Sequence, residues 1–490
     1  MSWFQWTIIS LFVCILLLAV TIYNSRKSGL SHIPGPFLAR YTDAWNLWLA
    51  WSTLHNGTGP SSYRKLQAKY GSVIRTGPNS VTVLDPSAVP TIYGVRSHLA
   101  KSPSYIPFRQ PNVTTSLLSI PEEHVHAKYR KLVSNAYSMS SIKGYEPYVD
   151  QTVARFVEVC REHAERKEPI NFSVWCHYYC FDVISILTFG YSLGFLEGKD
   201  SLGLIQRIKY FRDYTTLVSQ MPWLHKIFSD NFLLRSRKRS AFMDLVRDRI
   251  RGRMQEFKEE DKERPDFLSH LLASHFQHPE TMTEQQVMIF ASGNFIAGGF
   301  SPAATLNELC YYLVTHPNSQ DRLFAEVQQA GSPTTFDELK NLPYLEGVIR
   351  EAYRLHSSTS GTFQRVTNPD GLVLPNGCSL PGSAYVGCPS ATINRDTTIF
   401  GPDAYEYNPE RWLQGPNENS DEYSERRRAM DRAELSFGQG SRSCIGKSVV
   451  ALEMFKVIAS LVSHFKFELA GYPQKSEVKA FVHLREDVKR

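Results

Sequence analysis

The sequence contains few cysteines and no closely spaced pair that would organise a disulfide framework. Its eight cysteines are dispersed over 490 residues, and the motif CxxC does not occur. Such usage predicts a reducing compartment rather than a disulfide-stapled fold. Cys176 and Cys180 are four residues apart, but no second ligand pair accompanies them, so we interpret them as core residues rather than a zinc site.

The sequence also lacks a strong excess of charge of one sign. The net charge is +6, and the 54 lysines and arginines are scattered along the chain. Neither a zinc-finger spacing nor an RNA-binding motif is present, so no nucleic-acid partner is expected. Internal repeats and low-complexity segments are absent as well. With 42% hydrophobic residues, the chain can bury a large core.

Charged residues are missing from one long stretch at the amino terminus, residues 3–23. About 20 apolar residues suffice to cross the hydrocarbon of a bilayer. Arg26 and Lys27 follow this stretch, so the positive-inside rule keeps the rest of the chain in the cytosol. The sequence therefore predicts a transmembrane anchor over residues 1–27. The segment SHIPGPF predicts a proline-rich hinge over 28–40, and one domain follows over 41–490.

The remaining patterns predict a mainly α fold with minor β structure. Residues 72–85 read as two short strands around a Gly-Pro-Asn turn. Residues 120–355 are mostly helical in pattern, whereas 362–415 are rich in Gly, Pro and Asn and predict small strands and a meander. Apolar residues recur at three- and four-residue spacings between Ile445 and Val462, which predicts a final helix.

One cysteine stands in a setting unlike the others. Cys444 lies in the loop FGQGSRSCIG, residues 437–446, directly before that final helix. The positive end of the helix dipole favours a thiolate there, and Arg442 adds positive charge nearby. Gly438 and Gly440 carry no side chain and so let backbone N–H groups approach the sulfur closely.

Two further residues of the loop favour a broad, flat partner for this thiolate. Gly446 allows the following helix to lie flat against such a partner, and Phe437 supplies an aromatic wall. A cysteine nucleophile would need a nearby general base, and the loop contains none. The loop therefore predicts a large planar metallocofactor held through one thiolate.

This loop resembles the heme-binding loop of the cytochrome P450 family. It matches the family pattern at five fixed positions, Phe437, Gly440, Arg442, Cys444 and Gly446. The resemblance implies the cytochrome P450 fold, with Cys444 as the axial ligand of the iron of heme b. It covers essentially the whole chain. Residues 33–45 and 66–94 are especially similar to fungal members of the pisatin demethylase type.

Two more motifs carry the resemblance. EAYR, Glu351 to Arg354, matches the family's ExxR helix, and NPERW, residues 408–412, matches its later meander motif. The ExxR pattern is common by itself, and its place before the strand-rich part identifies it. The resemblance implies that Glu351, Arg354 and Arg411 form a buried charge network with a structural role.

The two propionates of heme call for cations. HVHAKYRKL, residues 124–132, resembles the family's helix with an aromatic residue four positions before an arginine. The resemblance places His126 and Arg130 in those two positions, and Arg365 matches a further propionate arginine. We therefore predict that Arg130, Arg365 and Arg442 bind the propionates. For His126, a solvated surface histidine is the alternative.

The oxygen site departs from the family pattern. The family carries an acid followed by a threonine in its long central helix, and here these positions hold Phe300 and Ser301. Gly298 is in place, and Pro302 is expected to distort the helix. Oxygen cleavage requires two protons, and general acid catalysis often contributes roughly 10²–10⁴-fold. Gly298 and Ser301 remain the candidate catalytic residues.

Three interpretations follow from this altered pair. In the first, the protein is a monooxygenase in which water, Ser301 or a substrate hydroxyl completes the proton relay. The second is a heme-thiolate isomerase, dehydratase or rearrangement enzyme without oxygen activation, and the third is a non-enzymatic heme protein. Glu308 lies on nearly the same helical face as Ser301, but seven residues place it about 10 Å away.

The expected substrate is a lipophilic secondary metabolite such as a terpenoid, alkaloid or polyketide. In the family, four segments line the substrate pocket, and here these are 104–118, 210–224, 294–302 and 357–363, which are aromatic and aliphatic with scattered hydroxyls. Phe300 is expected to narrow the space beside the iron.

The resemblance also implies redox partners and a location. A membrane-bound reductase would supply electrons from NADPH, and cytochrome b5 is a further expected partner. Arg432, Lys447 and the run Arg426–Arg428 are candidates for the docking face. The expected location is the endoplasmic reticulum membrane, with a single span and a cytosolic catalytic domain.

Overall fold

The structure of the protein is a computed structural model that describes most of the chain. The described residues are 28–57, 59–109, 116–200, 203–228, 241–256, 266–356, 361–471 and 477–485, together with 6, 12, 15, 19 and 21–23. Apart from those last few positions, the predicted membrane anchor over residues 1–27 lies outside the described residues.

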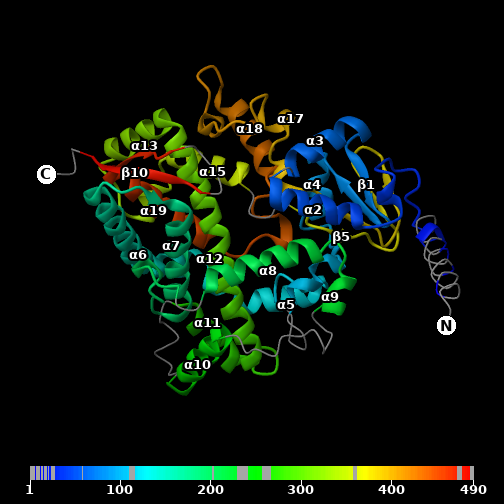
Figure 1. Ribbon diagram of the computed structural model, residues 1–490, viewed down its shortest axis with the longest axis horizontal. Helices are drawn as coiled ribbons and strands as arrows, with labels where there is room; N and C mark the ends of the chain where they lie inside the picture. Colours follow the sequence, from blue (N-terminus) through cyan, green and yellow to red (C-terminus); the bar gives the residue numbers. More distant parts are fainter. Residues whose placement is uncertain are drawn as a thin grey trace.

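Helices make up most of the protein, and short strands make up the rest (Figure 1). The first helices are η1 (Leu38–Arg40), α2 (Ala44–Asn56), α3 (Gly59–Tyr70), η2 (Pro86–Ala88), α4 (Val89–Tyr93), η3 (Pro103–Phe108), α5 (Glu123–Val133) and η4 (Ser134–Tyr137). The next are α6 (Met139–Arg166), α7 (Phe172–Phe189), η5 (Phe195–Glu197), α8 (Leu204–Val218), α9 (Trp223–Phe228), α10 (Ala241–Glu256) and α11 (Phe267–Gln277).

The long central helix α12 (Glu284–Thr315) opens the second half of the chain. The helices after it are α13 (Pro317–Gln329), α14 (Phe336–Leu339), α15 (Pro343–Leu355), α16 (Ser390–Ile393), α17 (Thr397–Phe400), η7 (Pro409–Trp412), α18 (Ser420–Ala433), η8 (Gly440–Arg442) and α19 (Lys447–His464). The mainly helical class predicted from the sequence is therefore confirmed, and α19 confirms the predicted final helix.

Three small sheets complete the fold. Five strands pair in the order β1-β2-β8-β5-β3, three in the order β4-β10-β9, and β6 pairs with β7. The strands are β1 (Val73–Gly77), β2 (Ser80–Val83), β3 (Ala100–Lys101), β4 (Ile170–Asn171), β5 (Arg365–Val366), β6 (Leu372–Val373), β7 (Ser379–Leu380), β8 (Tyr385–Gly387), β9 (Phe465–Leu469) and β10 (Lys479–Leu484).

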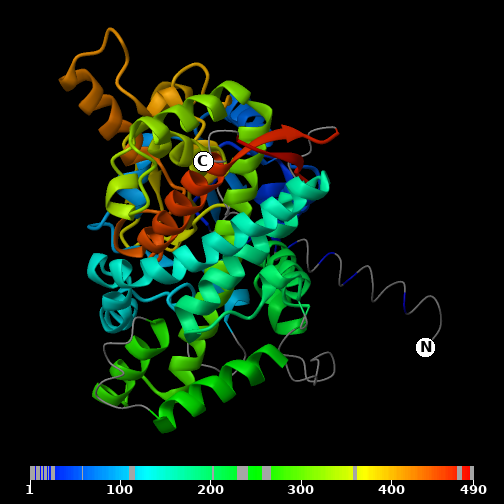
Figure 2. The same ribbon diagram turned by 90° about the vertical axis from the view of Figure 1, so that its left-hand side faces the viewer.

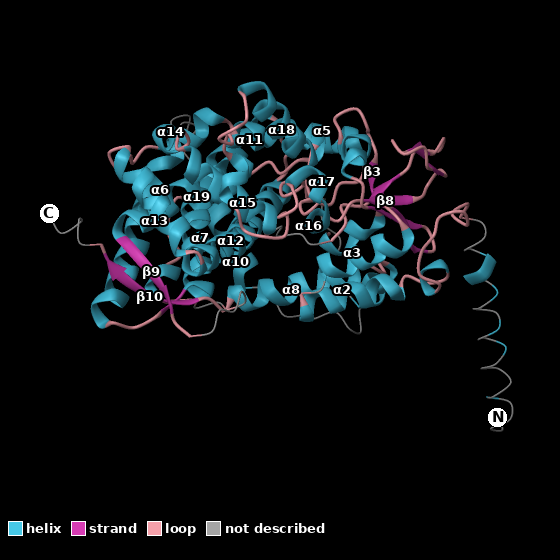
Figure 3. Cartoon of the chain, turned by 90° about the horizontal axis from the view of Figure 1, so that it is seen from above, coloured by secondary structure: helices cyan, strands magenta, loops and turns pink. Residues whose placement is uncertain are grey.

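The sheets sit at opposite ends of the molecule, with the helices between them (Figure 3). The strands β1 and β2 form an antiparallel hairpin, which confirms the strand pair predicted at 72–85. The β9–β10 hairpin lies near the carboxy terminus, and α10 and α11 extend from the body at a third side (Figure 2).

The proline-rich segment before α2 packs on the five-stranded sheet. Leu30 and Ile33 are buried in the same apolar cluster as the strands. The amide of Arg75 in β1 donates to the carbonyl of Pro34 at 2.8 Å. A Cβ at Gly35 would lie 2.1 Å from the Arg75 carbonyl oxygen, so only glycine fits there. The boundary between residues 40 and 41 stays a prediction.

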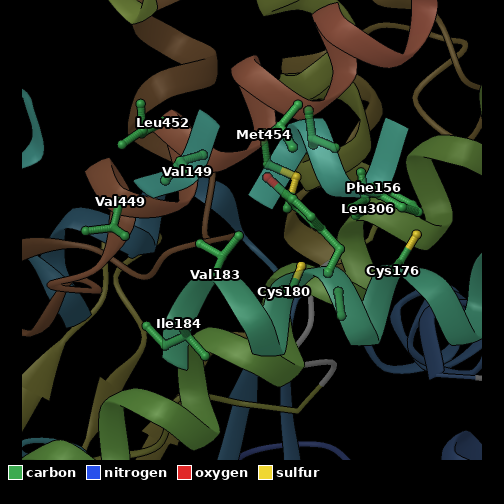
Figure 4. Packing of buried hydrophobic residues seen from close by; sticks show 14 of the residues in the cluster. Val149, Phe156, Cys176, Cys180, Val183, Ile184, Leu306, Val449, Leu452 and Met454 are labelled. Carbon is green, nitrogen blue, oxygen red and sulfur yellow. The ribbon is translucent and has the colours of Figure 1, made fainter. Parts of the chain in front are cut away.

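The main core forms where α6, α7, α12 and α19 meet. A Cβ on Gly298 would lie 2.6 Å from Ile184, and one on Gly299 would lie 2.2 Å from Phe181, so α12 approaches α7 closely. Figure 4 shows this packing, with labelled residues Val149, Phe156, Cys176, Cys180, Val183, Ile184, Leu306, Val449, Leu452 and Met454. By length and hydropathy, two described helices, α7 and α12, could cross a membrane, and both have large buried shares.

One carboxylic acid is buried in this core. Glu453 on α19 is 3% exposed, and its Oε1 atom has no hydrogen-bond partner among the described residues. Burial raises the pKa of Glu453 to about 8, although the thiol of Cys180 beside it acts in the opposite direction. Its ordinary pKa is 4.5. The folded protein therefore holds a proton on Glu453 through a pH range in which the unfolded chain has lost it.

This raised pKa predicts a pH-dependent difference between the protein and the E453Q variant. Between pH 4.5 and 8 the folded state binds the extra proton, so its stability falls as pH rises, by up to about 1.4 kcal/mol per pH unit. Glutamine removes that dependence. Thermal unfolding of both forms from pH 5 to 8 should show E453Q gaining stability relative to the native chain as pH rises. A difference that is constant with pH would contradict this expectation.

Candidate functional site

A buried ion pair at the end of α15 organises one side of the site. Both Glu351 and Arg354 have fully buried side chains, and two hydrogen bonds join them, Nε to Oε2 at 2.8 Å and Nη2 to Oε1 at 2.6 Å. Nε of Arg411 approaches Oε1 of Glu351 to 3.4 Å. Trp412 donates its indole N–H to Glu351 at 2.9 Å. The structure thus brings together the three residues predicted to form the charge network.

This network reaches the cysteine loop through Asn394. Arg354 donates to the Asn394 carbonyl at 2.8 Å. The side chain of Asn394 in turn accepts from the amide of Leu435 at 2.8 Å and donates to the hydroxyl of Ser436 at 3.0 Å. Ser436 immediately precedes Phe437, the first residue of the loop. Sequence reasoning missed Asn394, since nothing in its local pattern indicates a partner 41 residues ahead.

The loop then folds tightly around Cys444. The amide of Cys444 donates to the Phe437 carbonyl at 2.8 Å. Gly438 and Gly440 have φ angles of +64° and +66°, and a Cβ on Gly440 would lie 2.0 Å from the carbonyl oxygen of Tyr93. Gly440 is therefore required for the approach to α4. The sequence predicted that Gly438 and Gly440 let backbone N–H groups approach the sulfur. That prediction needs correction, because the N–H groups that reach the sulfur belong to a different part of the chain.

Those N–H groups belong to the start of α19. Gly446 is the N-cap residue of that helix, and the amides of Gly446 and Lys447 point at the Cys444 sulfur. Burial raises the pKa of the Cys444 thiol, while these amides and the charges of Arg130 and Lys447 act to lower it. The sequence assigned the positive charge near the sulfur to Arg442, whereas in the structure the charges that lower the pKa of the thiol are those of Arg130 and Lys447. Cys444 is nevertheless the only described cysteine with an exposed side chain, so it borders an interior space.

Two arginines tie the cysteine loop to α5. Arg130 donates from Nη1 to the Ser443 carbonyl at 2.8 Å. Arg442 pairs with Glu123 at 2.6 Å and donates to the carbonyls of Ile120 and Pro121 at 2.7 and 2.8 Å. These contacts attach the loop to both ends of α5, although α5 lies more than 300 residues away in the sequence.

Positive charge accumulates beside these arginines. Arg365 is buried, with its guanidinium 5.1 Å from the centre of the Tyr93 ring. Lys101, which sequence reasoning missed, is buried as well and donates to the carbonyls of Leu117 and Leu118. Burial lowers the pKa of Lys101 well below its usual value, and the charges of Arg365, Arg442 and Arg130 lower it further.

Among the described residues, the four cations Lys101, Arg130, Arg365 and Arg442 form only one ion pair, between Arg442 and Glu123. We call these four residues the cation cluster. Charge so concentrated away from water is costly unless anions compensate for it. The cluster therefore suits a ligand with more than one negative charge.

His126 lies next to the cation cluster and is buried rather than solvated. Its side chain is 2% exposed, and Nδ1 has no hydrogen-bond partner among the described residues. Burial lowers the pKa of His126 to about 3, and the charges of Arg442 and Lys101 lower it further. The alternative of a surface histidine is wrong. A neutral imidazole with a free ring nitrogen is available to a ligand of the cluster.

Helix α12 borders the same interior space. Ala297 is exposed although most of this helix is buried, and the hydroxyl of Ser301 donates to the Ala297 carbonyl at 2.9 Å. The hydroxyl of Tyr137, in η4, donates to Asn294 of this helix at 2.6 Å. Burial raises the pKa of Tyr137, and the nearby Cys444 raises it further. We use the name interior hollow for the region beside Asn294, Ala297 and Ser301 of α12 and Cys444 of the loop, where Ala297 and Cys444 are exposed.

Phe300 does not occupy the place expected for it. Its ring faces α7 and α8, 5.5 Å from the ring of His177 and 5.2 Å from the guanidinium of Arg212. The expectation that it narrows the space beside the iron is therefore wrong, because Phe300 lies about 100° around the helix from Ser301. Glu308 is buried and lies 3.9 Å from His356, away from Ser301.

Gly298 and Pro302 both fit within the regular course of α12. A Cβ on Gly298 would point at Ile184 of α7, so the lack of a side chain at Gly298 lets α7 pack closely on α12. Pro302 lies inside the helix, which continues to Thr315. The role of Gly298 and Ser301 in catalysis stays a prediction.

The segments predicted to line a substrate pocket are brought together where they are described. Phe108 of η3 meets Phe211 of α8 with ring centres 6.4 Å apart. Helix α8 also contacts α12. Parts of the predicted lining, residues 110–115 and 357–360, lie outside the described residues. The lining met here is aromatic, in keeping with an apolar ligand.

Two of the basic residues assigned to a docking face have internal partners. Arg426 binds Glu418 at 2.6 Å, and Arg427 binds Glu346 at 2.5 Å. Both arginines thus have ion-pair partners within the protein, and their assignment to a docking face stays a prediction. Arg428, Arg432 and Lys447 are exposed.

Comparison with known proteins agrees with this arrangement. The family model described as cytochrome P450 matches residues 42–486. A cytochrome P450 monooxygenase of Aspergillus terreus is 33% identical over 89% of this chain and 90% of its own length. The cytochrome P450 monooxygenase cicH of Emericella nidulans is 32% identical, over 94% and 92%. The cytochrome P450 monooxygenase vrtE of Penicillium aethiopicum is 31% identical, over 91% and 86%.

The chain belongs to the cytochrome P450 family. It is a heme-thiolate oxidoreductase whose cofactor is heme b and whose electrons come from NADPH through a reductase. The residues present fit this cofactor. Cys444 offers an accessible sulfur deep in the protein, and the cation cluster offers positive charge in excess for two propionates. The unpartnered nitrogen of His126 lies beside that cluster.

The buried ion pair predicts a large cost for the E351Q variant. Removing one partner leaves Arg354 charged and buried, which typically costs about 3–5 kcal/mol. We expect the variant to lose most of its bound heme, measured as heme per chain after purification. The matched control is K143M, which breaks an exposed ion pair with Asp337 and should retain heme like the native chain. Equal heme content in both variants would contradict the prediction.

The cation cluster predicts a role for Lys101 in holding heme. The K101M variant keeps the aliphatic stem but removes one positive charge from the propionate side, so heme should dissociate several times faster. Transfer of heme to excess apomyoglobin measures this rate. The control is K128M on the exposed face of α5, which should release heme at the native rate. If K101M also releases heme at that rate, the assignment of Lys101 is wrong.

Proposed function

We propose that this protein is a monooxygenase that oxidises a lipophilic secondary metabolite, such as a terpenoid, alkaloid or polyketide, in a fungal pathway. The observation that carries the proposal is the exposed thiol of Cys444 deep in the protein, on a loop held by Arg130 of the cation cluster. The fungal relatives named as monooxygenases support the reaction class. Hydroxylation or a related oxidation is the proposed outcome.

The chain's own residues take distinct parts in this proposal. Heme b held by Cys444 supplies oxygen activation, using electrons from NADPH. The amides of Gly446 and Lys447 and the charge of Arg130 stabilise the thiolate form of Cys444. The cation cluster and His126 bind the propionates, while Phe437, Gly438 and Gly446 surround the porphyrin. Ser301 holds a hydroxyl at the hollow, where it can pass a proton to oxygen through water.

The aromatic lining supports an apolar substrate. The rings of Phe108 in η3 and Phe211 in α8 lie 6.4 Å apart, so two of the segments expected to line the substrate pocket meet through aromatic side chains. The names of the relatives favour this oxygenase over an isomerase, dehydratase or rearrangement enzyme. The altered pair Phe300–Ser301 by itself does not favour that alternative, because Phe300 faces away from the hollow.

A membrane location is part of the same proposal. Large apolar side chains are exposed on neighbouring elements, with Trp48 and Trp51 on α2 and Trp223 and Phe228 near α8 and α9. Together with the apolar residues 3–23, such a surface favours attachment to the endoplasmic reticulum membrane with the catalytic domain in the cytosol. Arg428, Arg432 and Lys447 form the proposed docking face for the reductase, and cytochrome b5 is a further proposed partner.

The experiment that tests this function uses yeast microsomes carrying the full chain and a fungal reductase. A lipophilic fungal extract, NADPH and isotopically labelled dioxygen are supplied, and product masses are compared with those of the C444A variant. We expect a new product that carries one labelled oxygen atom, requires NADPH and is absent with C444A. The C444A chain must be present in the membrane fraction at a similar level for the comparison to hold.

Two other outcomes would each contradict the proposal. A Cys444-dependent product without label, formed even when NADPH is omitted, would identify a rearrangement enzyme. A label-free product that still requires NADPH would identify a desaturation or an oxidative coupling. Both outcomes preserve the heme-thiolate site and change only the reaction assigned to it.

A further inference from the structure

The side chain of Phe300 on α12, the residue before Ser301, contacts side chains of two other helices, α7 and α8. Its ring, on α12, has the imidazole of His177 on α7 at 5.5 Å and an interplanar angle of 61°. On the other side the guanidinium of Arg212, from α8, lies 5.2 Å from the ring centre. Cations so placed over an aromatic face are attracted by its quadrupole. Phe300 therefore joins α8 to α12 through a cation–π contact.

The helix segment around Phe300 has little stability of its own. Gly298 and Gly299 precede it, and Pro302 follows within two residues. Glycine has the largest conformational freedom to lose in a helix, and proline removes a backbone hydrogen bond. Among the described residues, the hydroxyl of Ser301 has one hydrogen bond, to the Ala297 carbonyl on the same helix. Any contact that fixes Phe300 also fixes the position of Ser301 next to it.

Arg212 is well suited to provide that contact. Asp213 pairs with its guanidinium at 2.6 Å, and the Arg212 side chain is 40% exposed. The neighbouring residue Phe211 packs against Phe108, which attaches α8 to η3 beside this contact. The family carries an acid at the position of Phe300. Here the ring of Phe300 attracts the guanidinium of Arg212 instead, so the contact needs no carboxylate and adds no titratable group.

We propose that Arg212 is a positioning residue of the oxygen site, which holds Phe300, and with it Ser301, in place through a cation–π contact between α8 and α12. The contact thus fulfils the positioning part of the altered acid–threonine pair. It leaves proton transfer to Ser301 and water. This role of Arg212 does not depend on which substrate the protein oxidises.

Amide hydrogen exchange of the heme-loaded, full-length chain in detergent tests this role. Peptides covering 294–305 report on α12, and those covering 204–218 report on α8. In R212M, and in F300L, exchange on α12 should rise by about 2- to 30-fold, the range expected for loss of one cation–π contact. The double variant R212M/F300L should rise no further than either single variant, because both remove the same contact.

Matched variants separate this contact from general loosening. R207M removes an exposed arginine of the same helix that forms no ion pair or side-chain hydrogen bond with another described residue, and it should leave exchange on α12 unchanged. F300Y keeps an aromatic face and should stay near the native rate even if F300L folds poorly. A second readout follows the oxygen site itself. With reductase and NADPH, R212M should release more hydrogen peroxide per NADPH consumed than R207M does.

The results that would overturn the proposal are specific. If the effects of R212M and F300L add in the double variant, the two residues act independently. If R212M raises exchange on α8 alone, Arg212 holds only its own helix. An unlabelled product in the oxygen experiment would reject the monooxygenase assignment, whereas these exchange results would stand or fall without it.

Discussion

The buried ion pair between Glu351 and Arg354 is the constraint on which the heme side of the structure depends. Neither side chain reaches solvent, so each must be satisfied inside the protein. Glu351 accepts hydrogen bonds from Trp412 and Arg411 of the meander. Arg354 donates to the carbonyls of Asn394 and Ala404. The chain between residues 394 and 412 is therefore wrapped around one charge pair. Through Asn394 that wrapping also sets the start of the cysteine loop.

A second constraint acts from the opposite side of the loop. Arg130 and Arg442 bind the loop to the two ends of α5, and Lys101 and Arg365 add their charges beside it. The protein thus concentrates positive charge where the loop is fixed. The two carboxylates of heme b would compensate this charge, so we propose that cofactor binding and folding support each other. The charge of Arg130, together with that of Lys447, favours a thiolate at Cys444, which burial alone would oppose.

Helix α12 carries the departure from the family pattern, and packing explains how the fold accommodates it. Gly298 and Gly299 let α7 lie close against α12, which turns the next side chain, Phe300, toward α7 and α8. A large apolar residue is therefore tolerated at a position where the family has an acid. The hollow itself is bordered by Asn294, Ala297 and Ser301, all small or polar residues. The side chain at the acid's position is accommodated by contacts with α7 and α8.

The sequence by itself determined the fold class, the β1–β2 hairpin, the final helix and the family. These depend on local signals such as hydrophobic periodicity, turn residues and the fixed spacing of the loop around Cys444. Only the tertiary structure decided the direction of Phe300, the burial of His126, the membership of Lys101 in the cation cluster and the link through Asn394. Each of these depends on residues far apart in the chain. Periodicity assigns a side chain to a helical face, but only packing decides which neighbour that face meets.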